Sequence, residues 1–140
     1  MAKETIRTFE NGVLVAEQVI DLPDPTADDV IAERERRFAL GFDYDFCDAR
    51  GVHRIGTTPA DMKGWDEVDK SASAMIALGS GAAPIPIVTD TGPVAVTAFE
   101  WKQIILAAAA HRQPIWHASF ALQALSPIPA DYADDRHWLQ

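Results

Sequence analysis

The sequence has one cysteine, few basic residues and no long apolar run, and each shortage excludes a class of protein. Cys47 has no partner for an internal disulfide. No apolar stretch approaches the roughly 20 residues of a membrane-spanning helix, so no membrane insertion is expected. Acidic residues outnumber basic ones by 21 to 12, which gives a net charge of −9. Because nucleic acid attracts clustered Lys and Arg, no nucleic-acid partner is expected either.

The residues that commonly hold metals or act as nucleophiles are also sparse. The four histidines form no ligand set, since His111 and His117 are six residues apart, the wrong spacing for a shared metal on a regular helix. Cys47 is near His53, but nothing nearby marks an oxyanion site, so we expect a half-buried structural cysteine. Three aspartates between residues 43 and 48 resemble a calcium loop, yet Arg54 stands where the closing Glu is needed. Phosphate-loop and dinucleotide motifs are missing too. We therefore expect no catalytic residue, no metal and no cofactor.

One triplet, Asp90-Thr91-Gly92, matches the catalytic motif of aspartic proteases. That mechanism needs two carboxylates sharing one proton, which a homodimer of a 140-residue chain could supply. The flanking Thr89 and Pro93 do not fit the motif, in which an apolar residue precedes Asp and Ser or Ala follows Gly. Asp and Gly are also the residues that a chain reversal favours. We predict a hairpin turn here and keep a homodimeric protease using Asp90 as a remote alternative.

Three segments have the pattern of short β-hairpins. Asn11-Gly12 lies between apolar runs and predicts a turn in an amino-terminal hairpin within residues 1–22. Both faces of that hairpin are largely apolar, so we expect it to pack against something on each side. Aromatic and acidic residues alternate over 42–46 before a turn at 48–51, and the third hairpin surrounds Asp90.

Three helices are predicted between the hairpins. Thr26, Thr58 and Thr97 are the expected N-caps, and Gly41 and Gly79 the expected ends of the first two helices. In the first helix the basic residues alternate with Glu33 and Glu35, which is typical of a solvated face; they are Arg34, Arg36 and Arg37. The third helix continues to Leu125 and is expected to be kinked at Pro114. The interleaved order predicts an α+β fold, with a compact domain over residues 23–140.

The last helix is apolar nearly all round, which is typical of a helix that is central or shared with another chain. Together with the two-sided apolar hairpin, it exposes more apolar surface than a monomer needs. We therefore predict that the protein acts by protein–protein binding. The candidate interface residues are Val13, Val15, Val19, Trp101, Ile105, Trp116, Phe120 and Trp138.

The order of these motifs resembles a family of small phage and prophage tail proteins that carry a tail-fibre-associated domain of unknown function. The resemblance rests on the helix end at residues 33–42, the short hairpin at 48–55 and the strand and helix at 94–125. The opening hairpin is similar to the start of many tail-fibre and fibre-assembly proteins. This resemblance implies no functional residues, because the family has no assigned activity.

The resemblance implies a non-catalytic structural or adaptor protein of a phage tail, associated with the fibre or baseplate. Its expected partners are other tail subunits, with a homo-oligomer as a further possibility. The expected location is the virion tail, after synthesis in the cytoplasm of the bacterial host. A fibre-assembly chaperone that leaves before the particle is finished is the alternative.

Overall fold

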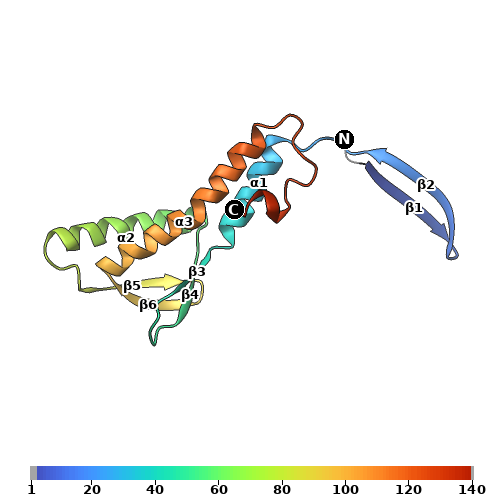
Figure 1. Ribbon diagram of the computed structural model, residues 1–140. Coiled ribbons are helices and arrows are strands. Elements are labelled where there is room, and N and C mark those ends of the chain that lie inside the picture. The colour runs from blue at the N-terminus through green and yellow to red at the C-terminus, as the bar shows by residue number, and fades with distance from the viewer. Residues whose placement is uncertain (1–2, 140) are drawn as a thin grey trace.

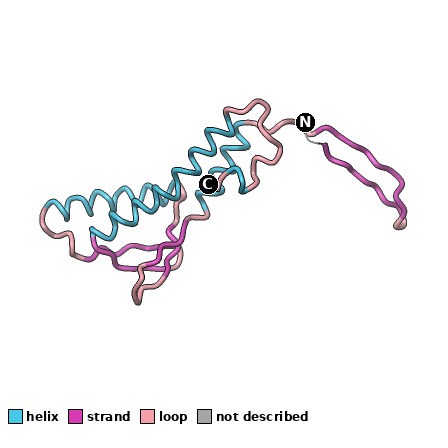
Figure 2. The backbone as a smooth tube through the Cα atoms, viewed as in Figure 1, coloured by secondary structure: helices cyan, strands magenta, loops and turns pink. Residues whose placement is uncertain are grey.

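A computed structural model describes residues 3–139. Residues 1–2 of the predicted amino-terminal hairpin (1–22) and residue 140 of the predicted domain (23–140) lie outside the described residues. The fold is α+β, as predicted: three two-stranded antiparallel hairpins alternate with three helices, and the last helix is long (Figures 1 and 2). The elements are β1 (Lys3–Glu10), β2 (Val13–Asp21), α1 (Ala27–Ala39), β3 (Phe42–Asp45), β4 (Val52–Ile55), α2 (Pro59–Ala77), β5 (Pro84–Thr89), β6 (Gly92–Thr97), α3 (Ala98–Gln123) and the short 3-10 helix η1 (Asp135–His137).

All three α-helices begin with a capping box, and the three predicted N-caps are confirmed. In each box the Thr hydroxyl accepts a hydrogen bond from the backbone N–H three residues on, and the acidic side chain there accepts one from the Thr N–H. These bonds satisfy backbone donors that the first turn leaves unpaired, and the acidic charge favours the positive end of the helix dipole. The pairs are Thr26–Asp29, Thr58–Asp61 and Thr97–Glu100.

Helix α3 runs without interruption through Pro114, so proline does not end it. Pro114 cannot donate the backbone hydrogen bond to Ala110 four residues earlier. Both residues are exposed to solvent, where water can replace the missing donor. A single helix therefore links the two halves of the domain.

The first core lies on the amino-terminal half of α3, where α2 and the second and third hairpins pack. The rings of Trp65 and Trp101 are 5.2 Å apart at its centre. Each indole N–H has an acceptor, since Trp65 donates to the Gly56 carbonyl at 2.8 Å and Trp101 to Asp69 at 3.2 Å. Buried indoles with satisfied N–H groups fix how α2 sits on α3.

The second core lies on the carboxy-terminal half of α3, against α1 and the tail. Trp138 is 1% exposed, and its indole N–H donates to the Tyr132 carbonyl at 2.6 Å. The tail after α3 is thus largely irregular, but its tryptophan is held in a core. The two cores pack on different halves of α3, and for this reason the helix is apolar on more than one side. The residues of this second core are Val30, Phe38, Ile115, Ala118, Leu122, Ile128 and Trp138.

The prediction of a solvated face on α1 is wrong for Glu33 and Arg37, which are 8% and 7% exposed. Arg37 donates to Glu33 at 2.9 Å, to Asp135 at 2.8 Å and to the Ala133 carbonyl at 3.0 Å. Hydrogen bonds from Arg36 and the charges of Arg36 and Arg37 hold the pKa of Glu33 below its usual value. This network ties the tail to α1.

Candidate functional site

The hairpin formed by β1 and β2 extends away from the rest of the chain (Figure 1). All residues of both strands are exposed except Ile20, which is half-buried. Asn11 and Gly12 adopt positive φ values of 51° and 79° at its tip, which is the turn that the sequence predicts. The expected packing on each face is not found within residues 3–139. The hairpin is an arm with both faces in water.

The tip of this arm is its most apolar part. A bulge between Thr8 and Phe9 shifts the register, so that Phe9 pairs with Leu14 and Glu10 with Val13. The bulge leaves Val15 unpaired beside them, which increases local twist. Within residues 3–139, fifteen large hydrophobic side chains are exposed; six of them lie on the arm, and we call these six the arm patch. They are Ile6, Phe9, Val13, Leu14, Val15 and Val19.

An isolated arm of this kind is not expected to be stable in water without a partner. A lone two-stranded hairpin is at best marginally stable. Each strand also presents an unpaired edge, which is a template for pairing with another chain. Salt bridges between the strands, such as Arg7–Glu17 at 3.0 Å, are exposed and add little. The arm therefore combines the two features that strand addition uses, backbone edges and alternating apolar side chains.

The predicted interface residues on α3 and in the tail fall into two groups. Trp101 and Trp138 are each 1% exposed and belong to the two cores, so a partner would not reach them in this conformation. Ile105 and Trp116 are half-buried and Phe120 is 61% exposed. The rings of Trp116 and Phe120 stack at 5.7 Å, and the Arg34 guanidinium lies 4.2 Å from the centre of the Trp116 ring. Of the predicted interface residues, only this second group and those on the arm are accessible to a partner.

The triplet at Asp90 forms the turn between β5 and β6, as predicted. Asp90 is exposed, and its backbone N–H donates to the Arg54 carbonyl at 2.9 Å. Thr89 is buried; its hydroxyl lies 2.8 Å from Nδ1 of His53 and 2.9 Å from the Gly92 carbonyl. These contacts make the turn part of the join between the second and third hairpins.

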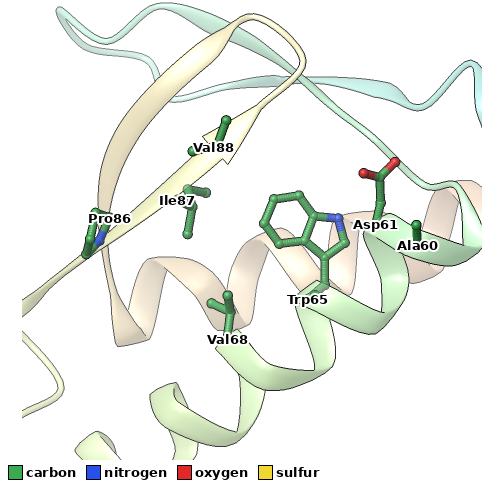
Figure 3. A pocket seen from close by; sticks show the side chains of 8 residues that line it. Ala60, Asp61, Trp65, Val68, Pro86, Ile87 and Val88 are labelled. Carbon is green, nitrogen blue, oxygen red and sulfur yellow. The ribbon is translucent and has the colours of Figure 1, made fainter.

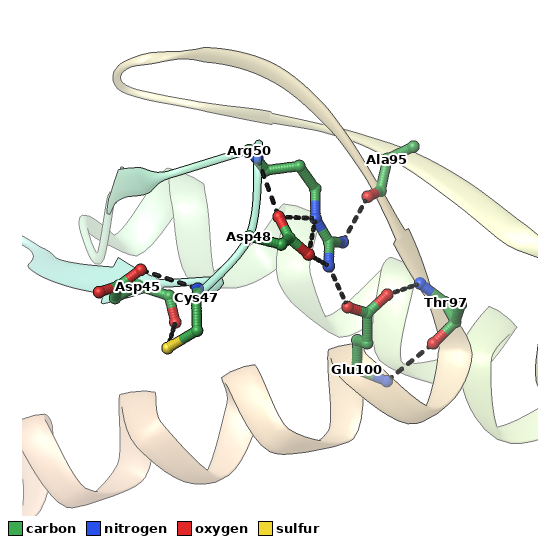
Figure 4. Close-up of polar contacts among 7 residues, drawn as sticks. All are labelled: Asp45, Cys47, Asp48, Arg50, Ala95, Thr97 and Glu100. Atoms are coloured by element: carbon green, nitrogen blue, oxygen red, sulfur yellow. Dashed lines mark hydrogen bonds and ion pairs between the residues drawn. The ribbon is translucent and has the colours of Figure 1, made fainter.

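Cys47 is exposed rather than half-buried, which corrects the prediction. Its φ is +58°, and its N–H donates to the Asp45 carboxylate at 2.8 Å, so a tight local turn points the side chain outward. Beside it, Arg50 bridges Asp48 and Glu100 at 2.6 and 2.5 Å (Figure 4). Hydrogen bonds from Arg50 lower the pKa of Asp48 to about 2. The cluster fastens this loop to the start of α3.

A groove of about 300 Å³ lies between α2 and β5. Trp65 and Val68 of α2 face it across from Ile87 of β5 (Figure 3). At its end, the Asp61 carboxylate accepts the Thr58 N–H at 3.0 Å as part of the capping box. Ligand pockets place a few converging polar groups among apolar walls, whereas the carboxylate here is already engaged. The groove is an apolar hollow in the surface.

Gly64 of α2 lines this groove and, as a glycine inside a helix, lowers the stability of α2. A Cβ at this position would meet no atom within 4 Å. Gly64→Ala is expected to raise the free energy of unfolding by about 0.5–1 kcal/mol, because alanine loses less backbone entropy in a helix. Urea denaturation would measure the change. Gly41→Ala is the contrasting control: with φ at +66° and a Cβ against the Ile55 carbonyl, it should destabilise. A loss of stability in Gly64→Ala would contradict the expectation.

His111 is half-buried, and the Nε2 atom of its ring is fully buried. Among the described residues, its Nε2 has no hydrogen-bond partner, and its ring stacks on Phe42 at 5.4 Å. Burial, then the charges of Arg112 and Arg54, hold the pKa of His111 below its usual value. The unfolded chain therefore binds this proton at higher pH than the folded chain, and stability falls as pH drops through about 6.5 toward the folded pKa.

His111→Phe is expected to remove that loss and flatten stability between pH 7.5 and 5, because the ring stays and the proton site goes. Urea midpoints across this window would test it, above the range where Glu33 and Glu100 titrate. Exposed His117→Gln is the control and should keep the parent profile. The same slope in His111→Phe as in the parent would assign the pH dependence to another group.

Within residues 3–139, no group of three or more His, Cys, Asp or Glu side chains is placed to hold a metal ion. Of the helices in this range, none has the length and apolar character to cross a bilayer. The chain matches no protein-family model, no curated protein and no solved structure.

Proposed function

We propose that this chain is a non-catalytic structural or adaptor protein of a phage or prophage tail, attached through the β1–β2 arm to a fibre or baseplate subunit. The observation that carries the proposal is the arm patch on a hairpin whose strands are exposed, within residues 3–139, at every position except Ile20. A free ribbon with apolar residues on both faces is stabilised when another protein covers it. The resemblance of residues 33–125 to small tail proteins supports the phage tail as its setting.

The rest of the chain is suited to carry such an arm. The two cores on α3 fold without contribution from the arm, since neither includes a residue before Val30. Only a short proline-containing link, residues 22–26, joins the arm to α1. Two prolines in that link restrict its backbone and keep the arm from collapsing onto the domain.

Quantitative mass spectrometry of gradient-purified particles, together with the producing-cell lysate, tests this function. A fixed ratio of the chain to tail proteins in the particle is the expected result. Recovery only from lysate, bound to a fibre protein, would instead favour the assembly chaperone. Absence from both particles and fibre complexes would overturn the tail assignment.

A further inference from the structure

The middle of α3, between the two cores, holds an arginine without a carboxylate partner. On this helix the first core ends at Ala108 and the second begins at Ile115, and Arg112 lies between them. Every other arginine of the chain forms a salt bridge with an Asp or Glu side chain, whereas Arg112 forms none within residues 3–139. In this range, a half-buried cation of a chain with a net charge of −9 thus has no counter-charge in contact with it.

Arg112 is held in place by one side of its guanidinium. Its Nη1 donates to the Thr57 carbonyl at 2.9 Å, and the guanidinium lies 4.1 Å from the centre of the Phe38 ring. Thr57 and Phe38 are 0% and 2% exposed, so both contacts are with well-packed residues. Within residues 3–139, Nε and Nη2 of Arg112 make no hydrogen bond. These two nitrogens share the edge of the guanidinium on which a carboxylate accepts two parallel hydrogen bonds.

Two hollows adjoin Arg112, and Met62 and Trp116 line both of them. One, of about 230 Å³, reaches Glu35 of α1. The other, of about 250 Å³, reaches Ile105, which like Trp116 is one of the predicted interface residues. Pockets for separate small ligands are usually about 300–1,000 Å³, so each hollow has the size to take a side chain of another protein. Together they combine apolar walls with one cation that has donors to spare.

Glu35 does not supply the missing counter-charge. Its carboxylate is paired with Arg34 at 3.0 Å and forms no salt bridge with Arg112. Burial holds the pKa of Arg112 below its usual value, and the charge of Glu35 offsets this only in part. A carboxylate at the free edge of the guanidinium would reduce the cost of burying this cation.

We propose that the two hollows at Arg112 bind a segment of a partner protein in which a Glu or Asp side chain is flanked by apolar residues. The carboxylate accepts hydrogen bonds from Nε and Nη2 of Arg112, and the apolar side chains pack against Met62 and Trp116. Charge selects a carboxylate over a phosphate, because one guanidinium neutralises one negative charge, whereas Glu35 and the net charge of −9 repel a dianion. The proposal does not depend on what the arm binds.

Titration of the full chain with short peptides tests the site, with the NMR shifts of the Arg112 Nε–H and the Trp116 indole N–H as the readout. Acetyl-Phe-Glu-Phe-amide is expected to bind with a Kd of about 1–10 mM, as a fragment of a larger interface. Acetyl-Phe-Gln-Phe-amide has the same shape without the charge and should bind at least about tenfold more weakly. Acetyl-Gly-Glu-Gly-amide lacks the apolar flanks and should also bind at least about tenfold more weakly.

Two variants connect the binding to the guanidinium. Arg112→Gln should remove the preference for the Glu peptide over the Gln peptide, because the charge is lost. Arg136→Gln is the matched control: its side chain is 66% exposed in the tail, and the variant should keep the full preference. The peptide comparison is made on the parent chain, so it holds even if Arg112→Gln lowers stability.

Three results would overturn the proposal. The first is equal binding of the Glu and Gln peptides to the parent, and the second is no shift at Arg112 or Trp116 at peptide concentrations up to about 20 mM, twice the weakest expected Kd. The third concerns the source of the carboxylate: a small apolar carboxylate released on denaturation from the natively purified parent, but not from Arg112→Gln, would assign the site to a free ligand instead of a partner segment.

Discussion

Arg37→Ala is expected to lower the free energy of unfolding by about 3–4 kcal/mol, a large fraction of the stability of a small domain. The side chains of Arg37 and Glu33 are 8% and 9% exposed, so water screens this ion pair little, whereas the second partner, Asp135, is 73% exposed. Loss of the Arg37 side chain leaves the Ala133 carbonyl without this donor and removes the cation that lies 5.0 Å from the Trp138 ring. Urea denaturation at pH 7 would measure the loss.

The same substitution should release the tail. Arg37 is the side chain that joins α1 to residues 133 and 135, so the amide N–H groups of Trp138 and Leu139, which donate to Asp135, should exchange faster with solvent. Arg36→Ala is the matched control, because Arg36 contacts the same Glu33 but is 57% exposed. It should cost much less stability than Arg37→Ala and leave tail exchange unchanged. Equal effects of the two substitutions would show that burial of Arg37 adds nothing.

The elements were predictable because their signals are local. Each capping box lies within four residues, and a Thr followed by an acidic residue at the third position satisfies the first turn wherever the helix packs. Asn11-Gly12 likewise fixes a turn through its own backbone preferences. Gly41 and Gly79 have positive φ at the helix ends, as expected. Nothing distant is needed to specify these features.

The contacts that were mispredicted depend on residues far apart in sequence. Arg37 is 98 residues from Asp135, and no helical pattern in α1 reveals that the tail returns to bury it. The exposure of Cys47 was mispredicted for a local reason instead: the Asp45 carboxylate holds Cys47 in a turn with positive φ, a conformation that few cysteines adopt. Periodicity also could not separate core from surface on α3, because two cores at its two ends leave apolar residues on every side.

The candidate site could be predicted only in part from the sequence, for a related reason. The sequence shows that both faces of the hairpin are apolar, but the absence of any covering element within residues 3–139 is a property of the whole fold. Trp101 and Trp138 are of a residue type that often anchors interfaces, but both are buried in the cores. What separates them from Val13, Val15 and Phe120 is burial, which composition alone does not give.

Val13→Asp combined with Val15→Asp is expected to reduce incorporation into particles by about 100-fold or more. The two side chains are 64% and 51% exposed at the tip of the arm, and a partner that covers the tip would bury both. Burying two carboxylates without partners costs several kcal/mol, and each 1.4 kcal/mol is a tenfold loss of affinity. Quantitative mass spectrometry of purified particles, normalised to a major tail protein, measures the change.

Two controls separate attachment from folding and from added charge. Because the arm contributes to neither core, thermal unfolding of the domain should be the same in the double variant and the parent. Gln18→Glu adds a charge to the same arm at an exposed polar position, and Leu78→Asp replaces an 83% exposed apolar residue far from it. Both should incorporate normally. If the double variant also incorporated normally, the arm patch would not be the attachment surface.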